Sequence, residues 1–448
     1  MKKSLSKIEN LLLFLLPIII WFAYYPVIRI GQNESMNFEL SLPLIWLAIF
    51  GTISMFKMPA ILSHYKTKKS ILILLFPIFA VISVFWSANP LRGILTAGIL
   101  WLIFMSVMNI INTKLEKTYL MRLLRIYMTM SVGVALFCLL QCFADVFLAS
   151  RDVTLLCQGC TYATLGFPHP NGLAIEPQFM GNLLIAPTLI SLLLLYNAIK
   201  NKLRKRTMFG FVCLSIFLIM SLYICFSRGA LYAFGIGGAI MGILLLFRDK
   251  SARAFWLMVP VVIGCIGGLL LQGLWAEISL TSENFAQGIQ RSIHQITLGK
   301  IDFREKVSTD GEQSSFSGYI EESTNVRLNL NEIAFKTWDV NNKWFGVGIG
   351  GAGVAMSKQS DELGSKEIVQ NEFINILIEL GVVGYILLFI LVGVICKNLY
   401  KMKGWIFMVP IIMAYLITMC FFSGFPNVLH IYLMTPILYW VGQKRLLC

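Results

Sequence analysis

Arg228 is the residue of this sequence whose surroundings most favour chemistry. It lies in the segment Phe226–Ala230, between two long apolar runs and with almost no loop to carry its charge into water. A charge near the centre of a membrane helix costs about 2.5 to 3.5 kcal/mol, so we expect the guanidinium to point into the protein at the membrane surface. A fixed guanidinium there can bind a diphosphate through paired hydrogen bonds and stabilise the leaving charge. The alternative is an arginine that only extends its charged end to the interface.

His169 and Glu176 lie close together in the segment Phe167–Phe179, at the start of another apolar run. Two prolines flank the histidine and predict a bent backbone ahead of that run. We expect Glu176 to lie about one helical turn inside the membrane, where a carboxylate either pairs with an arginine or takes part in proton transfer. The alternative is a carboxylate that only stabilises a helix start, with Pro177 in its first turn.

Asn371, Asn375 and Glu379 recur at every fourth residue and predict one polar face on a helix that enters the membrane. Such a face must be covered by protein or water, because lipid cannot satisfy its hydrogen bonds. Capping of the helix start accounts for Asn371 but not for Asn375 and Glu379. Gln370 directly precedes this face, and Arg327, farther upstream, has by itself the character of a surface residue.

A glycine-rich segment, Phe345–Gly351, lies between Arg327 and this polar face. Glycines at this density predict a turn where the backbone packs closely or approaches a ligand. They do not predict dinucleotide binding, because no strand–helix–strand unit surrounds them. Residues 329–338 have apolar positions at helical spacing and predict a short amphipathic helix, whereas loops without structure are expected around 308–324 and 357–367.

Cys157 and Cys160 lie in a polar segment that is expected outside the cytoplasm. A local disulfide between them is one open alternative. A metal site would need a second pair of ligands, which the neighbouring sequence lacks, so no metal is expected.

The elements that must position these residues are membrane helices. Charged residues make up 13% and apolar residues 57% of the chain, and the mean hydropathy is +0.75, whereas a soluble domain holds about 25% charged residues. Apolar runs of membrane-spanning length recur along nearly the whole sequence. They predict twelve spans, at residues 11–30, 40–56, 71–88, 93–112, 126–148, 172–196, 207–226, 230–247, 255–274, 372–396, 406–423 and 427–442.

Basic residues cluster in every second loop between the predicted spans. By the positive-inside rule, these loops and both termini are cytoplasmic, and the large loop before the tenth span lies outside. The prediction is an all-α polytopic membrane protein with spans 1–9 at residues 1–274, an extracytoplasmic loop at 275–371 and spans 10–12 at 372–448. The net charge of +14 does not indicate nucleic-acid binding, because the basic residues lie in short clusters rather than along one stripe.

The order of these segments resembles the O-antigen ligase and O-antigen polymerase superfamily of bacterial envelope glycan transferases. The twelve-span plan with a large outer loop before the tenth span is similar to that family, so the resemblance covers most of the chain. The motifs that carry it are Trp86–Pro90 with Arg92 nearby, Phe167–Asn171, Ser227–Ala230, Arg327 with Trp344–Gly348, and Gln370–Phe373 with Glu379–Gly381.

The resemblance implies a metal-independent C-type glycosyltransferase that needs no cofactor and acts at the outer face of the bacterial cytoplasmic membrane. Its donor would be a glycan on undecaprenyl diphosphate, and its acceptor a glycan, the lipid A core of lipopolysaccharide, or a protein. Arg228 and Arg327 carry over as diphosphate ligands, and transfer would be a direct displacement at the anomeric carbon. The candidate substrate-binding residues are Arg228, Arg327, Ser227, Asn371, Asn375 and Glu379.

The sequence departs from the family where a catalytic histidine is expected, because Gln370 stands there and a neutral amide cannot take a proton at pH 7. Either Gln370 only positions the acceptor, or the base lies elsewhere, with Glu176 and His169 as candidates. Within the resemblance, the Glu-Pro pair at Glu176 is more typical of the polymerase-like members and so favours a polymerase over a ligase.

Other functions share this plan. A protein O-oligosaccharyltransferase would differ only in its acceptor, and a peptidoglycan polymerase would have about ten spans. A flippase for lipid-linked glycans or a secondary transporter would show internal repeats and charges near the midplane. Here no repeat is visible, and the polar residues gather near the predicted outer face.

Overall fold

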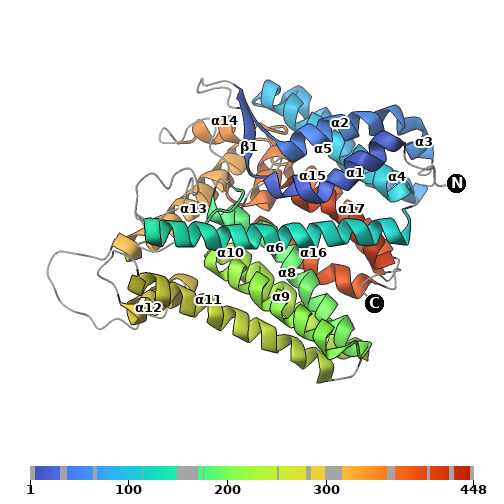
Figure 1. The fold of residues 1–448 in the computed structure, drawn as a ribbon. Helices are drawn as coiled ribbons and strands as arrows, with labels where there is room; N and C mark the ends of the chain where they lie inside the picture. The colour runs from blue at the N-terminus through green and yellow to red at the C-terminus, as the bar shows by residue number, and fades with distance from the viewer. Residues whose placement is uncertain are drawn as a thin grey trace. The chain divides into compact units, whose positions relative to one another are not determined.

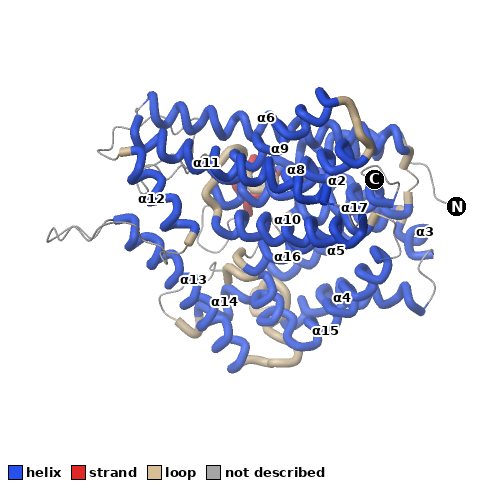
Figure 2. Tube along the Cα trace, turned by 90° about the horizontal axis from the view of Figure 1, so that it is seen from below, coloured by secondary structure: helices blue, strands red, loops and turns tan. Residues whose placement is uncertain are grey.

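The computed structural model describes residues 6–30, 38–63, 68–113, 115–148, 170–174, 176–249, 252–278, 284–297, 315–360, 369–400, 404–422 and 428–443. The regular elements in these ranges are helices, apart from one two-stranded antiparallel hairpin, which Figures 1 and 2 show. Contacts divide the chain into two compact units: unit 1 comprises residues 1–124, 326–408 and 419–446, and unit 2 comprises residues 125–325, 409–418 and 447–448.

Unit 1 is built around α5, which packs against α2, α4 and α17, while α15 packs along α4 (Figure 2). Asn89 caps α5 by accepting a hydrogen bond from the backbone N–H of Arg92, and Pro90 occupies the first turn, where its missing N–H costs nothing. The elements lying wholly in this unit are α1 Lys7–Ile19, η1 Ile20–Phe22, β1 Pro26–Ile30, β2 Phe38–Ser41, α2 Leu42–Phe56, α3 Met58–Leu62, α4 Lys68–Ile82, η3 Ser83–Trp86, α5 Pro90–Asn112, α14 Ala352–Ser357, α15 Glu372–Tyr400 and α17 Leu429–Gln443.

In unit 2, α9 packs between α8 and α11, and α10 packs on α8 (Figure 1). Nearly all of α8 is buried, because neighbouring helices surround it. The elements of this unit are α8 Pro177–Lys200, α9 Lys205–Ile224, α10 Arg228–Asp249, η5 Ala252–Leu257, α11 Met258–Ile278 and α12 Phe285–Ile296. The unit boundary falls inside three further helices, α6 Lys117–Leu148, α13 Ser315–Val340 and α16 Trp405–Cys420.

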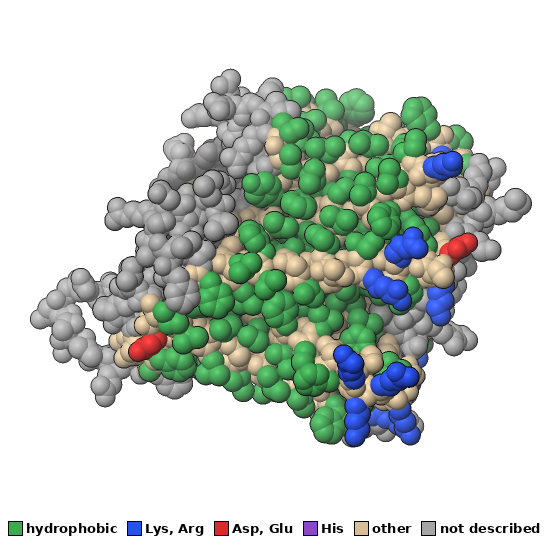
Figure 3. All heavy atoms as spheres, in the orientation of Figure 1, with side chains coloured by type: hydrophobic (Ala, Val, Ile, Leu, Met, Phe, Trp, Pro, Cys, Tyr) green, Lys and Arg blue, Asp and Glu red, His purple; other side chains and the backbone are tan. Residues whose placement is uncertain are grey.

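The protein is a multi-pass membrane protein. Seven helices among the described residues, α5, α6, α8, α9, α10, α11 and α15, are long and apolar enough to cross a membrane. In unit 2, α11 exposes Val259, Val262 and Ile266 on one face, which is the face that lipid must cover. Figure 3 shows apolar side chains covering the length of such helices, with Lys and Arg gathered toward helix ends.

The basic loops of unit 2 lie at one end of its helices. The loop between α8 and α9 carries Lys202 and Arg204, and Arg248 lies in the last turn of α10. The short helix η5, which carries Arg253, contacts both α8 and α10, so these basic residues share one end. The positive-inside rule requires this arrangement, because it places the basic loops of successive helix pairs on one side of the membrane.

A helix lies within each of the twelve predicted runs, but only seven of these helices are, over their described residues, long and apolar enough to be candidate spans, and the first run is helical only in part. The run 11–30 was predicted as one span, whereas the helical part ends at Phe22 and β1 begins at Pro26. Tyr25 precedes a proline, which disfavours the helical conformation, and β-branched residues follow, which favour a strand. β1 then pairs with β2, with Ile30 opposite Phe38.

The large predicted loop contains more helix than expected. The amphipathic helix predicted at 329–338 is the C-terminal part of α13, which begins at Ser315 and so replaces part of the loop expected at 308–324. Once Leu330, Ile333 and Ala334 are anchored in a core, extending the helix toward its N-terminus costs little, because nucleation is the expensive step. On the exposed face of α13, the hydrogen bond from Lys336 lowers the pKa of Glu332. A second helix, α12, was not predicted at all.

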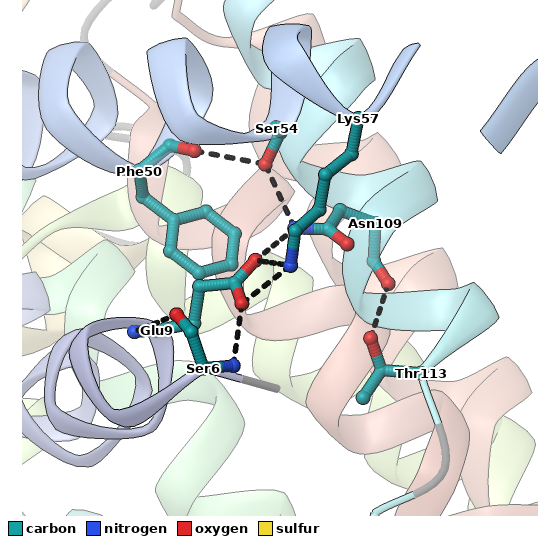
Figure 4. A network of polar contacts seen from close by, with 7 residues as sticks. All are labelled: Ser6, Glu9, Phe50, Ser54, Lys57, Asn109 and Thr113. Atoms are coloured by element: carbon teal, nitrogen blue, oxygen red, sulfur yellow. Dashed lines mark hydrogen bonds and ion pairs between the residues drawn. The ribbon is translucent and has the colours of Figure 1, made fainter. Parts of the chain in front are cut away.

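A buried ionic network joins three helices of unit 1 (Figure 4). Glu9 on α1 is fully buried, and both of its carboxylate oxygens lie 2.5 Å from Lys57 Nζ at the end of α2. Asn109 on α5 donates its side-chain amide to Glu9 Oε1 at 3.1 Å and to Ser54 Oγ at 3.0 Å. The buried Glu9 carboxylate therefore has both a cation and an amide as partners, as a buried charge requires.

Replacing Lys57 with Met should lower the free energy of unfolding by about 3 kcal/mol, because it leaves a buried carboxylate without its cation. Thermal unfolding of the purified protein in detergent measures this. The variant Lys7→Met, which changes an exposed lysine of α1, serves as the control and should have little effect. The double variant Glu9→Gln, Lys57→Met should recover much of the stability, and equal losses for Lys57→Met and Lys7→Met would contradict this account.

Candidate functional site

Arg228 begins α10, immediately after a turn that leaves no free loop. α9 ends at Ile224, and Phe226 turns the chain with a φ of 55°, a left-handed conformation that is uncommon for a bulky residue. Ser227 Oγ then accepts a hydrogen bond from the backbone N–H of Ala230 at 3.4 Å and caps α10. The half-buried Arg228 is thus held at the start of α10.

An arginine in the first turn of a helix needs an explanation. The N-terminus of a helix carries a partial positive charge, so a cation is disfavoured there by about 0.3 to 1 kcal/mol. Backbone N–H groups that lack helical partners and a guanidinium at the same place both attract an anion. The position of Arg228 therefore suits the binding of a negatively charged group better than it suits helix stability.

Glu176 lies at the same end of unit 2 as Arg228. The contact that establishes this is at Gly181, where an added Cβ would lie 2.9 Å from the Ser227 Cβ and 3.0 Å from the Ala230 Cβ. Gly181 is in the second turn of α8, whose start Glu176 marks, and Ser227 marks the start of α10. The two helix starts are therefore neighbours, and a carboxylate and a guanidinium share this end.

The placement of Glu176 differs from the prediction. It was expected one turn inside the membrane, whereas it is exposed and precedes the first residue of α8. Pro177 is the reason, because a proline fits the first turn but not the interior of a helix. The Glu176 carboxylate accepts a hydrogen bond from the Gln178 side chain. His169, Cys157 and Cys160 lie outside the described residues.

In unit 1, the helix that carries the polar face is broken. Gly381 has φ 62° and ψ −166°, which interrupts α15 between Leu380 and Val382. The backbone groups that the break releases bond to residues 343–348 instead. The N–H groups of Val382 and Val383 donate to the carbonyls of Lys343 and Trp344, at 3.0 Å each. Such a break is tolerated inside the membrane region because other backbone groups of the protein form the hydrogen bonds that the helix loses.

The glycine-rich segment packs closely against backbone, as predicted. Gly346, Gly348 and Gly350 all have positive φ, and an added Cβ on Gly348 would lie 2.4 Å from the Ser87 Cα. The same segment binds the turn between η3 and α5. Ser87 Oγ donates to the Ile349 carbonyl at 2.8 Å, and the backbone N–H of Ala88 donates to the Val347 carbonyl at 2.9 Å. The structure thus joins the motifs at 86–92, 344–351 and 379–381, which are far apart in sequence.

Glu379 and Asn375 are buried within the protein, as the predicted polar face requires. The Glu379 carboxylate accepts hydrogen bonds from the backbone N–H groups of Gly350 and Ala352, and Arg92 and Glu372 are its charged neighbours. This ties the carboxylate to the glycine-rich segment. Within the described part of the chain, the buried Asn375 Oδ1 accepts no hydrogen bond.

Asn371 caps α15. Its side-chain oxygen accepts hydrogen bonds from the backbone N–H groups of Phe373 at 3.0 Å and Ile374 at 3.2 Å. Capping thus accounts for Asn371, and these two bonds occupy the acceptor atom of its side chain. Gln370 precedes it and is half-buried.

Arg327 lies inside α13, not ahead of an isolated short helix. It is half-buried, one turn before Leu330. A small core joins this part of α13 to the start of α15: it contains Leu330, Ile333, Val369 and Ile378. Arg327 and Gln370 therefore flank the same core.

The helices define a polytopic helical membrane protein, and each of its two units carries polar residues at or near helix starts. Residues 209–389 match the family model described as O-antigen ligase, which confirms the resemblance to the O-antigen ligase superfamily. The matched stretch contains every candidate site residue except His169 and Glu176. No curated protein matches the chain.

Proposed function

We propose that this protein is a C-type glycosyltransferase of the bacterial cytoplasmic membrane, which transfers or polymerises glycan units from an undecaprenyl-diphosphate donor on the outer face. The observation that carries the proposal is the O-antigen ligase match, which runs from α9 into α15 and includes Ser227, Arg228 and Arg327. The acceptor is a glycan, a lipid A core or a protein. Both termini are then cytoplasmic, and the chain uses neither a metal nor a cofactor.

The reaction we propose is a direct displacement. The acceptor hydroxyl oxygen forms a bond to the anomeric carbon of the donor sugar, while the bond from that carbon to the diphosphate oxygen breaks. Arg228 and Arg327 bind the diphosphate and stabilise the charge that undecaprenyl diphosphate carries away. The hydroxyl proton goes to a base. Gln370 cannot supply that base, so it positions the acceptor.

Glu176 is the described residue best suited to be the base, because it is an exposed carboxylate at the helix end that neighbours Arg228. Glu176→Gln should lower the transfer rate by at least about a hundredfold, the usual contribution of a general base. Steady-state transfer by purified variants measures this. Its side chain makes no capping bond to α8, so Gln should leave stability unchanged. Near-normal transfer by Glu176→Gln would exclude Glu176 and leave His169 as the candidate.

Disruption of the gene in its host tests the function as a whole. Lipid-linked glycans and surface glycans are extracted from the disrupted strain and from strains that carry the wild-type gene or Arg228→Ala. We expect lipid-linked units to accumulate on the outer face and surface glycan to be lost or shortened, with rescue by the wild type alone. Accumulation only on the cytoplasmic face would instead indicate a transporter.

A further inference from the structure

Unit 1 contains a cavity of about 550 Å³, a volume within the range of small-molecule sites. It lies where the glycine-rich segment meets the turn before α5, beside α14. Its lining combines two aromatic side chains, three amides and one cation: Trp86, Phe345, Asn341, Asn342, Gln359 and Lys358. None of the candidate residues above lines it.

The aromatic wall of this cavity is exposed yet rigid. Trp86 is 38% and Phe345 46% exposed, and their ring centroids lie 6.2 Å apart in an edge-on arrangement. Phe79 contacts both rings: its ring centroid lies 6.1 Å from that of Trp86 and 6.4 Å from that of Phe345. Trp86 Nε1 donates to the Phe345 carbonyl at 3.3 Å, which ties the two residues together. Aromatic faces held in place in this way can stack on a ligand with little loss of side-chain entropy.

The polar lining offers both donors and acceptors. Asn342 Oδ1 is occupied by the backbone N–H groups of Trp344 and Phe345, which leaves its amide nitrogen to donate. Asn341 offers an acceptor instead, because its amide nitrogen donates to the Thr337 carbonyl at 2.7 Å and its side-chain oxygen is left to accept. Gln359 and Lys358 are both exposed. This mixture suits hydroxyl groups, each of which donates and accepts.

We propose that this cavity is a saccharide-binding subsite, which holds sugar rings of the glycan away from the reacting bond. The proposal rests on the glycosyltransferase function above. A sugar ring has an apolar face of C–H groups and a rim of hydroxyls, and the cavity presents aromatic faces beside amides. A lipid chain would leave the amides without partners, and a diphosphate would find only one cation among the lining residues. The rings belong to either the donor glycan or the acceptor glycan.

Direct binding tests the subsite without requiring turnover. Oligosaccharide released by mild acid from the lipid-linked fraction of the disrupted host is titrated into purified protein in detergent. Trp86→Ala and Gln359→Ala should each weaken binding, Trp86→Ala by about tenfold. Trp344→Ala is the matched control, because Trp344 is an exposed tryptophan of the same segment that does not line the cavity. Trp86→Phe, which keeps an aromatic ring, should retain most of the affinity.

Transfer kinetics identify the source of the rings. Trp86→Ala should raise KM for the donor if the subsite holds donor rings, or KM for the acceptor if it holds acceptor rings, with kcat little changed. Unchanged binding by Trp86→Ala, or equal losses for Trp86→Ala and Trp344→Ala, would overturn the subsite, since equal losses indicate membrane-interface anchoring. Saccharide binding that depends on Trp86 in a protein that transfers no glycan would overturn the proposed function and leave the subsite standing.

Discussion

Arg228→Ala should reduce glycan transfer by about a thousandfold, the upper range for removing one preorganised donor to a developing charge. The expected cause is the loss of charge stabilisation on the departing diphosphate. The guanidinium is positioned for this role because a short, hydrogen-bonded turn fixes Arg228 at the start of α10. Transfer rates of purified protein in lipid vesicles measure the effect.

Two further variants separate this role from a structural one. Arg228→Lys keeps the charge but loses the paired hydrogen bonds, so it should recover only part of the rate. Arg248→Ala removes an exposed arginine from the last turn of the same helix and should transfer normally. Equal activity of Arg228→Ala and Arg248→Ala would show that Arg228 is only an interfacial arginine. A loss of thermal stability in Arg228→Ala alone would assign it a structural role.

Gly381→Ala should cost about 4 kcal/mol or more of folding stability, because its backbone conformation is one that essentially only glycine adopts. An added Cβ would also lie 2.4 Å from the Trp344 carbonyl oxygen. The break in α15 could not then keep its hydrogen bonds to residues 343–348. Little folded protein should be recovered, and the unfolding temperature of what remains should fall sharply.

Gly393→Ala is the matched control for this prediction. Gly393 lies in the same helix, beyond the break, and no atom lies within 4 Å of an added Cβ there. Alanine is also the better helix former by about 1 kcal/mol. Gly393→Ala should therefore be as stable as the wild type or more so. If Gly381→Ala proved as stable as Gly393→Ala, the broken helix would not be the structure of α15.

The membrane helices could be read from the sequence because the signal is physical and local. Apolar length decides which segments can cross a bilayer, and each predicted run contains a helix, although the run 11–30 also contains strand β1. The close packing of the glycine-rich segment was also predictable, since Gly346, Gly348 and Gly350 lie where only glycine avoids a clash. The burial of Asn375 and Glu379 followed from their spacing.

What the sequence could not reveal depends on contacts between distant segments. No local pattern indicates that Trp86 and Ser87 meet Phe345 and Ile349, because hydrogen bonds across more than 250 residues join them. The break at Gly381 depends likewise on backbone hydrogen bonds to a distant segment, residues 343–348. Glu176 lies ahead of α8 for a local reason instead: Pro177 sets the start of the helix, and the length of the apolar run does not show this.

Reconstitution tests the central claim most directly. The purified protein is placed in vesicles with the lipid-linked glycan extracted from the disrupted host and with a matching acceptor, and both the glycan products and the freed lipid diphosphate are measured. We predict that larger or newly attached glycan appears together with an equal amount of undecaprenyl diphosphate, and that neither appears with Arg228→Ala. Movement of the lipid-linked glycan between leaflets without any new glycosidic bond would contradict the account and identify the protein as a transporter.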